Sequence, residues 1–117
     1  MSVYKLDDVK EEKLNPLLSR KIIAGEKVML AWLHLAKGCV VPLHNHVHEQ
    51  ISYIVRGALK FTFPNEKREI AARAGDVVVI PSNLAHSAEA LEDTVDIDCF
   101  TPLREDWLSG KDSYLRK

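Results

Sequence analysis

Short strand-like segments separated by turn residues are the feature of this sequence that most restricts its fold. Between Ser19 and Phe100 the chain passes through apolar or alternating stretches, each closed by glycine, proline or an acidic pair. Turn signals at such regular intervals are typical of a small all-β sandwich or barrel. No strand–helix–strand alternation is present, which argues against a parallel sheet. The expected strands are Ser19–Ala24, Lys27–Ala36, Ile51–Val55, Ala58–Phe63, Glu69–Ala72, Val77–Ile80, Ala85–Leu91 and Thr94–Phe100.

The sequence predicts a single domain over residues 1–117, with the barrel core at about residues 19–102. Residues 1–18 are expected to form an irregular lead-in or a first edge strand. Residues 104–107 favour a helical turn in a short C-terminal tail. The nearly continuous apolar character of Lys27–Ala36 and Val77–Ile80 predicts strands that are covered on both faces.

Charge and composition exclude several classes of partner. The net charge of -1, without a basic stripe, argues against nucleic acid and against an anionic membrane surface. No apolar run approaches the roughly 20 residues of a membrane span. Cys39 and Cys99 form neither a disulfide framework nor a CxxC pair, and the first residues lack an apolar leader. A cytoplasmic location is therefore expected.

A cluster of histidines predicts a metal site. His44, His46 and His48 lie within five residues of one another, and His86 follows later in the chain. Because alternate side chains of a strand share a face, His44 and His46 can reach one divalent ion, and Gln50 has the same parity. His86 would complete the site from another strand. The alternative is a solvated loop of polar side chains.

Three further residues compete for roles at this site. Glu49 adjoins Gln50 and offers a carboxylate, although parity favours the Gln50 amide. His48 falls in the bend and is expected to support the ligands, and His34 to pack or line the interior. Three imidazoles and one amide leave the charge of the ion uncompensated, which makes it a stronger Lewis acid. Such ligands suit one divalent ion of Zn, Ni, Fe or Mn, and also Cu.

The spacing of these residues resembles the two motifs of the cupin family. The first motif is matched by Gly38, His44, His46, Gln50 and Gly57, and the second by Gly75, Pro81, Asn83 and His86. The resemblance implies a double-stranded β-helix, or jelly roll, with His44, His46 and His86 as metal ligands and Gln50 where a glutamate is usual. The chain departs from the second motif at Asn83, where glycine is common, and at Ala90, where asparagine is common. We interpret both as variation in turn and packing.

Residues 96–108 are similar to the C-terminal signature of the KdgF pectin-degradation cupins. In that group the resemblance implies a small enzyme that linearises 4,5-unsaturated monouronates, and therefore a small anionic sugar substrate. Carried over residue by residue, it assigns Asp98 as the acid/base, Phe100 as a pocket wall and Arg104 as the binder of the substrate carboxylate. It also implies a homodimer.

The chemistry of that reaction suits these residue types. Ring opening removes the anomeric hydroxyl proton, and the resulting enol is protonated at carbon. A carboxylate can perform both transfers, and a guanidinium can hold the substrate carboxylate through two hydrogen bonds. A dioxygenase using iron or copper, and a non-catalytic sugar- or metal-binding domain, are the alternatives.

Strand parity leaves the orientation of the acidic residues open. Asp96, Asp98 and Phe100 share one face of their strand, and the apolar residues between them share the other. Parity alone does not decide which face points inward. In the opposite orientation both acids face solvent. Separately, Arg104 can be a surface ion-pair partner of Glu105 and Asp106, and Phe100 can serve as plain core filler.

Overall fold

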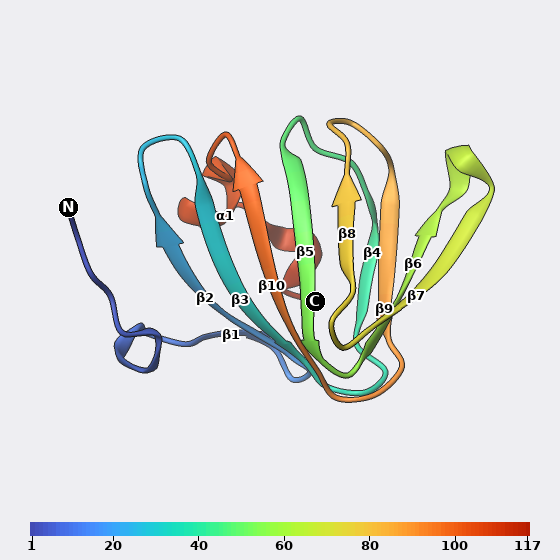
Figure 1. Ribbon diagram of the computed structural model, residues 1–117, viewed down its shortest axis with the longest axis horizontal. Helices are drawn as coiled ribbons and strands as arrows, with labels where there is room; N and C mark the ends of the chain where they lie inside the picture. Colours follow the sequence, from blue (N-terminus) through green and yellow to red (C-terminus); the bar gives the residue numbers. More distant parts are fainter.

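The computed structural model describes residues 1–117 and folds them into two antiparallel sheets around one core (Figure 1). The six-stranded sheet has the order β1-β2-β3-β10-β5-β8, and the four-stranded sheet β4-β9-β6-β7. The strands are β1 Glu12–Asn15, β2 Leu18–Ala24, β3 Met29–Leu35, β4 Val40–His44, β5 Glu49–Arg56, β6 Ala58–Phe63, β7 Arg68–Arg73, β8 Val77–Ile80, β9 His86–Ala90 and β10 Thr94–Thr101. The helices are short: η1 Leu6–Asp8, η2 Pro64–Glu66, α1 Glu105–Leu108 and η3 Ser113–Leu115. The predicted all-β jelly roll is confirmed.

Strand register brings distant polar residues together. β10 lies between β3 and β5, and its pairing with β5 sets Asp98 opposite Ser52 and Phe100 opposite Gln50. In the other sheet β4 pairs with β9, and His44 lies opposite His86. Because a strand alternates its faces, each of these inward positions repeats every second residue.

The outer face of the six-stranded sheet is more apolar and more exposed than the sequence predicts. Val77–Ile80 was expected to be covered on both faces, which is wrong: Val77 and Val79 are 56% and 59% exposed, while Val78 and Ile80 face the core. β3 likewise buries only one face fully. The apolar runs of β3 and β8 therefore belong to strands with one buried face and one exposed apolar face. Hydrophobic periodicity alone does not distinguish such a strand from one that is buried on both faces.

Two turn residues explain local features of the sequence. Gly57 has φ +92°, and a Cβ there would lie 2.5 Å from both the Asp93 carbonyl oxygen and Thr94 Oγ1. Asn83, where a glycine is common in cupins, has φ +67°. Asparagine visits this left-handed region more readily than most residues, so the substitution preserves the turn.

The two ends of the chain pack against each other. Within the lead-in, β1 forms the edge strand and pairs with β2. The C-terminal cap (residues 102–117) contains α1, at the position where a helical turn is expected, and η3. It is held by the fully buried ion pair of Arg20 with Asp112 and by the Asn15 side-chain amide, which donates to the Leu115 carbonyl at 2.8 Å. None of the helices is long and apolar enough to cross a membrane.

Candidate metal centre and its pocket

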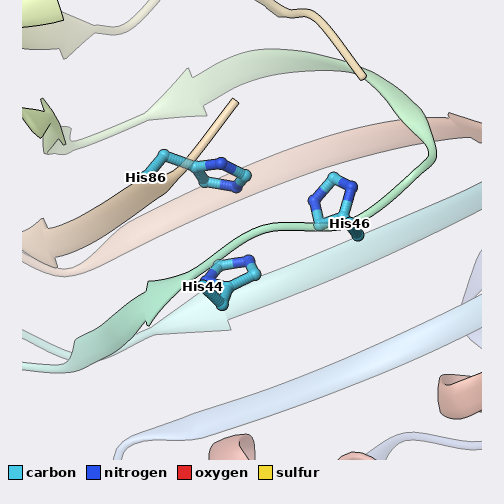
Figure 2. Close-up of side chains that lie close together, drawn as sticks. All are labelled: His44, His46 and His86. Carbon is cyan, nitrogen blue, oxygen red and sulfur yellow. The ribbon is translucent and has the colours of Figure 1, made fainter. Parts of the chain in front are cut away.

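Three histidines converge at one end of the barrel. His44 ends β4, His86 begins β9, and His46 lies in the loop before β5. One ligand atom from each ring lies within 4.8 Å of the others, and Figure 2 shows the rings gathered around a common space. The centroids of the His44 and His86 rings are 4.3 Å apart, and those of His46 and His86 are 5.1 Å apart. This cluster can hold a metal ion.

Strand parity is not what brings His46 into the cluster. β4 ends at His44, so the expectation that both residues share one strand face is wrong. The loop turns His46 inward instead, and the Asn83 N–H donates to the His46 carbonyl at 2.8 Å. The turn of positive φ at Asn83 thus pins the loop that carries His46 to the loop that precedes His86.

Each ring has a backbone carbonyl oxygen beside its Nδ1. Nδ1 of His44 lies 2.8 Å from the Pro42 carbonyl, Nδ1 of His46 lies 3.0 Å from that of His48, and Nδ1 of His86 lies 2.8 Å from that of Leu84. A carbonyl oxygen only accepts, so Nδ1 of His44 and of His86 carries the proton and donates it, and Nε2 of both rings keeps its lone pair. His46 has an acceptor oxygen beside each nitrogen, and a metal at its Nε2 would leave the proton on Nδ1, the arrangement that metal-binding histidines use.

Burial keeps the three imidazoles neutral. It lowers the pKa of His44 to about 4 and that of His46 to about 3, and it lowers the pKa of His86 as well. The nearby Arg104 guanidinium acts in the same direction on all three. At neutral pH the cluster therefore presents lone pairs rather than protons, as metal binding requires.

Gln50 joins the cluster through its amide oxygen. It lies near the start of β5, is buried, and places Oε1 3.1 Å from Nε2 of His46. Its amide N–H donates to Ser52 Oγ at 2.9 Å, and the Ser52 hydroxyl donates to Asp98 Oδ1 at 2.6 Å. Glu49, the competing ligand, is exposed. The position of Gln50 fits its predicted role as a ligand, which stays a prediction.

Both acids of β10 face inward. Asp96 is 3% exposed and Asp98 5%, whereas Ile97 and Cys99 on the opposite face are only partly buried. Burial raises the pKa of Asp96 well above its ordinary value, and the neighbouring Asp98 charge raises it further. Burial also raises the pKa of Asp98, against hydrogen bonds from Asp96 and Ser52 that lower it. Oδ1 of Asp96 has no partner, so Asp96 is the member of the pair that retains a proton.

Arg104 is a buried residue of the same pocket. Its guanidinium stacks 4.9 Å from the Phe100 ring centroid and 4.5 Å from that of Trp107. Asp106 accepts from Nε and Nη2 at 3.1 and 3.0 Å, and Tyr114 Oη accepts from Nη2 at 2.7 Å. The alternative of a surface ion pair is wrong for the arginine, which is 2% exposed.

One pocket unites these groups. It is lined by His44, His86, Gln50, Asp96, Asp98, Phe100 and Arg104 among other residues. The C-terminal cap supplies three lining residues that sequence reasoning missed: Trp107, Tyr114 and Leu115. Tyr114 covers His44, with ring centroids 4.9 Å apart. His34 lies outside the pocket, stacked on Trp32, and His48 supports the site through its carbonyl, which accepts from His46.

Comparison with known proteins identifies the family. The sequence model of the family described as "Cupin domain" matches residues 31–100 of the chain. The structure of KdgF from a Halomonas species superposes with a TM-score of 0.83 and 33% sequence identity, over 91% of this chain and 99% of that one. The chain belongs to the cupin family.

Other cupin-like structures share its architecture. An RmlC-like cupin from Shewanella frigidimarina has a TM-score of 0.80 and 26% identity, over 86% of this chain and 90% of that one. The polyketide cyclase RemF from Streptomyces resistomycificus has a TM-score of 0.74 and 18% identity, over 87% and 79% of the two chains, which is a likeness of fold alone. No curated protein matches the chain. The family match and the Halomonas structure confirm the resemblance to cupins and to KdgF that the sequence motifs indicate.

Proposed function

We propose that this cupin is a metal-dependent enzyme that linearises 4,5-unsaturated monouronates. The observation that carries the proposal is that one pocket is lined by His44 and His86 of the metal-competent cluster, by a buried carboxyl pair and by a buried arginine. The substrate class comes from the similarity of residues 96–108 to the KdgF signature, and the likeness to the Halomonas KdgF structure supports it.

Asp98 moves the proton in this proposal. Its carboxylate accepts the proton of the anomeric hydroxyl, and the bond between C1 and the ring oxygen breaks as C1 becomes a carbonyl. The electron pair stays on the ring oxygen as an enolate that is conjugated with C4. Asp98 then returns the proton to C4, and C5 becomes a ketone. Atoms and electrons balance without an oxidant, and one carboxyl group acts first as base and then as acid.

The other residues bind and orient the substrate. Arg104 Nη1 makes no hydrogen bond to the chain and is available to the substrate carboxylate, while Asp106 and Tyr114 hold the rest of the guanidinium in place. Phe100 forms the wall between Arg104 and His46, whose ring meets it edge-on at 5.9 Å. A divalent ion held by the histidines and Gln50 would polarise a substrate oxygen and stabilise the negative charge that develops on it.

The C-terminal cap must shift to admit a sugar ring. The free space in the pocket is about 50 Å³, which holds only a few water molecules. Tyr114 covers His44 and hydrogen bonds Arg104, so its outward movement would enlarge the pocket beside both residues. We therefore propose that substrate binding displaces this tyrosine.

The test is turnover of unsaturated galacturonate by protein loaded with Zn²⁺, Ni²⁺, Mn²⁺ or Fe²⁺, with metal content measured. Loss of the absorbance of the conjugated double bond, faster than in buffer, is expected. In D₂O the product should carry deuterium at C4, because that carbon receives its proton from a group that exchanges with solvent. No acceleration by any loaded form would refute the proposal. Oxygen consumption with a flavonol or diketone would favour a dioxygenase instead.

A further inference from the structure

We infer that Ser52 is a positioning residue: it determines which end of the Gln50 amide faces the metal. This inference rests on the proposed metal site but not on the proposed reaction. Ser52 is fully buried in the middle of β5, two residues along the same inward face from Gln50 and directly opposite Asp98. No motif of the sequence singles it out.

Three contacts form one directional chain. Gln50 Nε2 donates to Ser52 Oγ at 2.9 Å, Ser52 Oγ donates to Asp98 Oδ1 at 2.6 Å, and Gln50 Oε1 lies 3.1 Å from Nε2 of His46. A serine hydroxyl has one proton to donate. Because Asp98 accepts that proton, the Ser52 oxygen can only accept from residue 50, and only the amide nitrogen can donate to it.

The opposite orientation of the amide would be unfavourable beside Ser52 and would compete with the metal beside His46. A flipped Gln50 would set its oxygen against the Ser52 oxygen with no proton between them. It would also place its N–H₂ against Nε2 of His46, where it would donate to the lone pair that a metal needs. Ser52 therefore keeps the Gln50 oxygen, and the His46 nitrogen, directed at the same point. This is the role of residues that orient metal ligands from behind.

A double-mutant cycle tests this orientation directly. Protein stripped with a chelator is titrated with Zn²⁺ by calorimetry in four forms: the parent, Ser52→Ala, Gln50→Glu and the double variant. A carboxylate has two equivalent oxygens, so its orientation needs no selection. We expect Ser52→Ala to weaken Zn²⁺ binding by about 10- to 100-fold in the parent, the range found for such partners. In the Gln50→Glu background the same change should weaken binding less than about threefold, or strengthen it.

Two further measurements separate orientation from general damage. Ser52→Thr keeps the hydroxyl and should hold Zn²⁺ within a few-fold of the parent. The visible absorption of bound Co²⁺ should change when Ser52→Ala is made in the parent, because the ligand oxygen is no longer held, and should not change when it is made in the Gln50→Glu variant. Equal loss in both backgrounds would show a merely structural role and overturn the inference, as would no loss in the parent background. A parent that binds no metal would overturn the metal site as well.

Discussion

Replacing Asp96 by asparagine should stabilise the folded protein increasingly as pH rises. Burial raises the pKa of this carboxyl well above its ordinary value of 3.8, and the Asp98 charge adds to the shift. A folded-state pKa above the unfolded one means that the folded protein holds the proton more tightly. The parent protein therefore loses stability as pH rises from the unfolded-state pKa of Asp96 through its folded-state pKa. The loss is about 1.4 kcal/mol for each pH unit between these two pKa values. Asparagine has no proton to lose and escapes this loss.

The surroundings of Asp96 indicate how large the gain in the free energy of unfolding should be. Oδ1 of Asp96 has no hydrogen-bond partner in a residue that is 3% exposed, and a buried acceptor left unpaired costs about 1–3 kcal/mol, more if it is charged. The asparagine leaves the same oxygen unpaired but uncharged, so urea unfolding of metal-free protein in alkaline buffer should show a gain set by the cost of the buried charge, on the order of 1 kcal/mol or more. Below the ordinary pKa of 3.8 the carboxyl is protonated in both states, and the gain should be close to zero.

Asp98→Asn is the matched control, two residues along the same face of β10. It should abolish most turnover, by about 10²- to 10⁴-fold for a lost acid/base group, with metal content unchanged. Asp96→Asn should retain turnover within about tenfold, because its amide N–H can donate to Asp98 as the protonated carboxyl does. A stability loss that is the same at every pH, or a loss of turnover equal to that of Asp98→Asn, would show that Asp96 is not the proton-holding member of the pair.

Three further predictions concern substrate binding, assembly and the turns. Arg104→Lys should raise KM for the uronate by about 10- to 100-fold in initial-rate measurements, since the forked geometry is lost; an unchanged KM would remove the arginine from substrate binding. The homodimer stays a prediction: Tyr53→Lys on the exposed outer sheet face should yield a monomer by light scattering while Val28→Lys in a turn should not, and a monomeric parent would contradict it. Gly57→Ala should lower the Tm by more than Gly75→Ala, because both have positive φ but only Gly57 lacks room for a Cβ; equal losses would contradict the close approach.

The metal cluster was predictable from the sequence because the ligand types and their spacing matched a known pattern. The physical account attached to that pattern was only partly right. His44 and His86 do lie opposite each other on paired strands, whereas His46 enters from a loop whose path depends on the Asn83 turn. Local parity cannot reveal that β4 ends at His44, because the strand ends where its pairing with β9 ends.

Two features of the pocket could not be predicted from the local sequence: the inward orientation of Asp96 and Asp98, and the position of Tyr114. Alternation showed that Asp96 and Asp98 share a face, but only the register with β5 turns that face inward. Nothing local marks Tyr114 as a pocket residue. Its place depends on the ion pair of Arg20 with Asp112, whose partners are far apart in the chain and come together only in the finished fold.

The amide at position 50 is explained by the carboxylate at position 98. A glutamate at residue 50 would turn a second acceptor toward Ser52, whose single proton is already donated to Asp98. It would also add a negative charge to an interior that buries Asp96 and Asp98. Glutamine avoids both costs, because its N–H₂ donates to the serine while its oxygen faces the histidine cluster. In the proposed enzyme, an acid/base carboxylate at position 98 would therefore go with a neutral ligand set, and the uncompensated charge of the ion would be available to an anionic substrate.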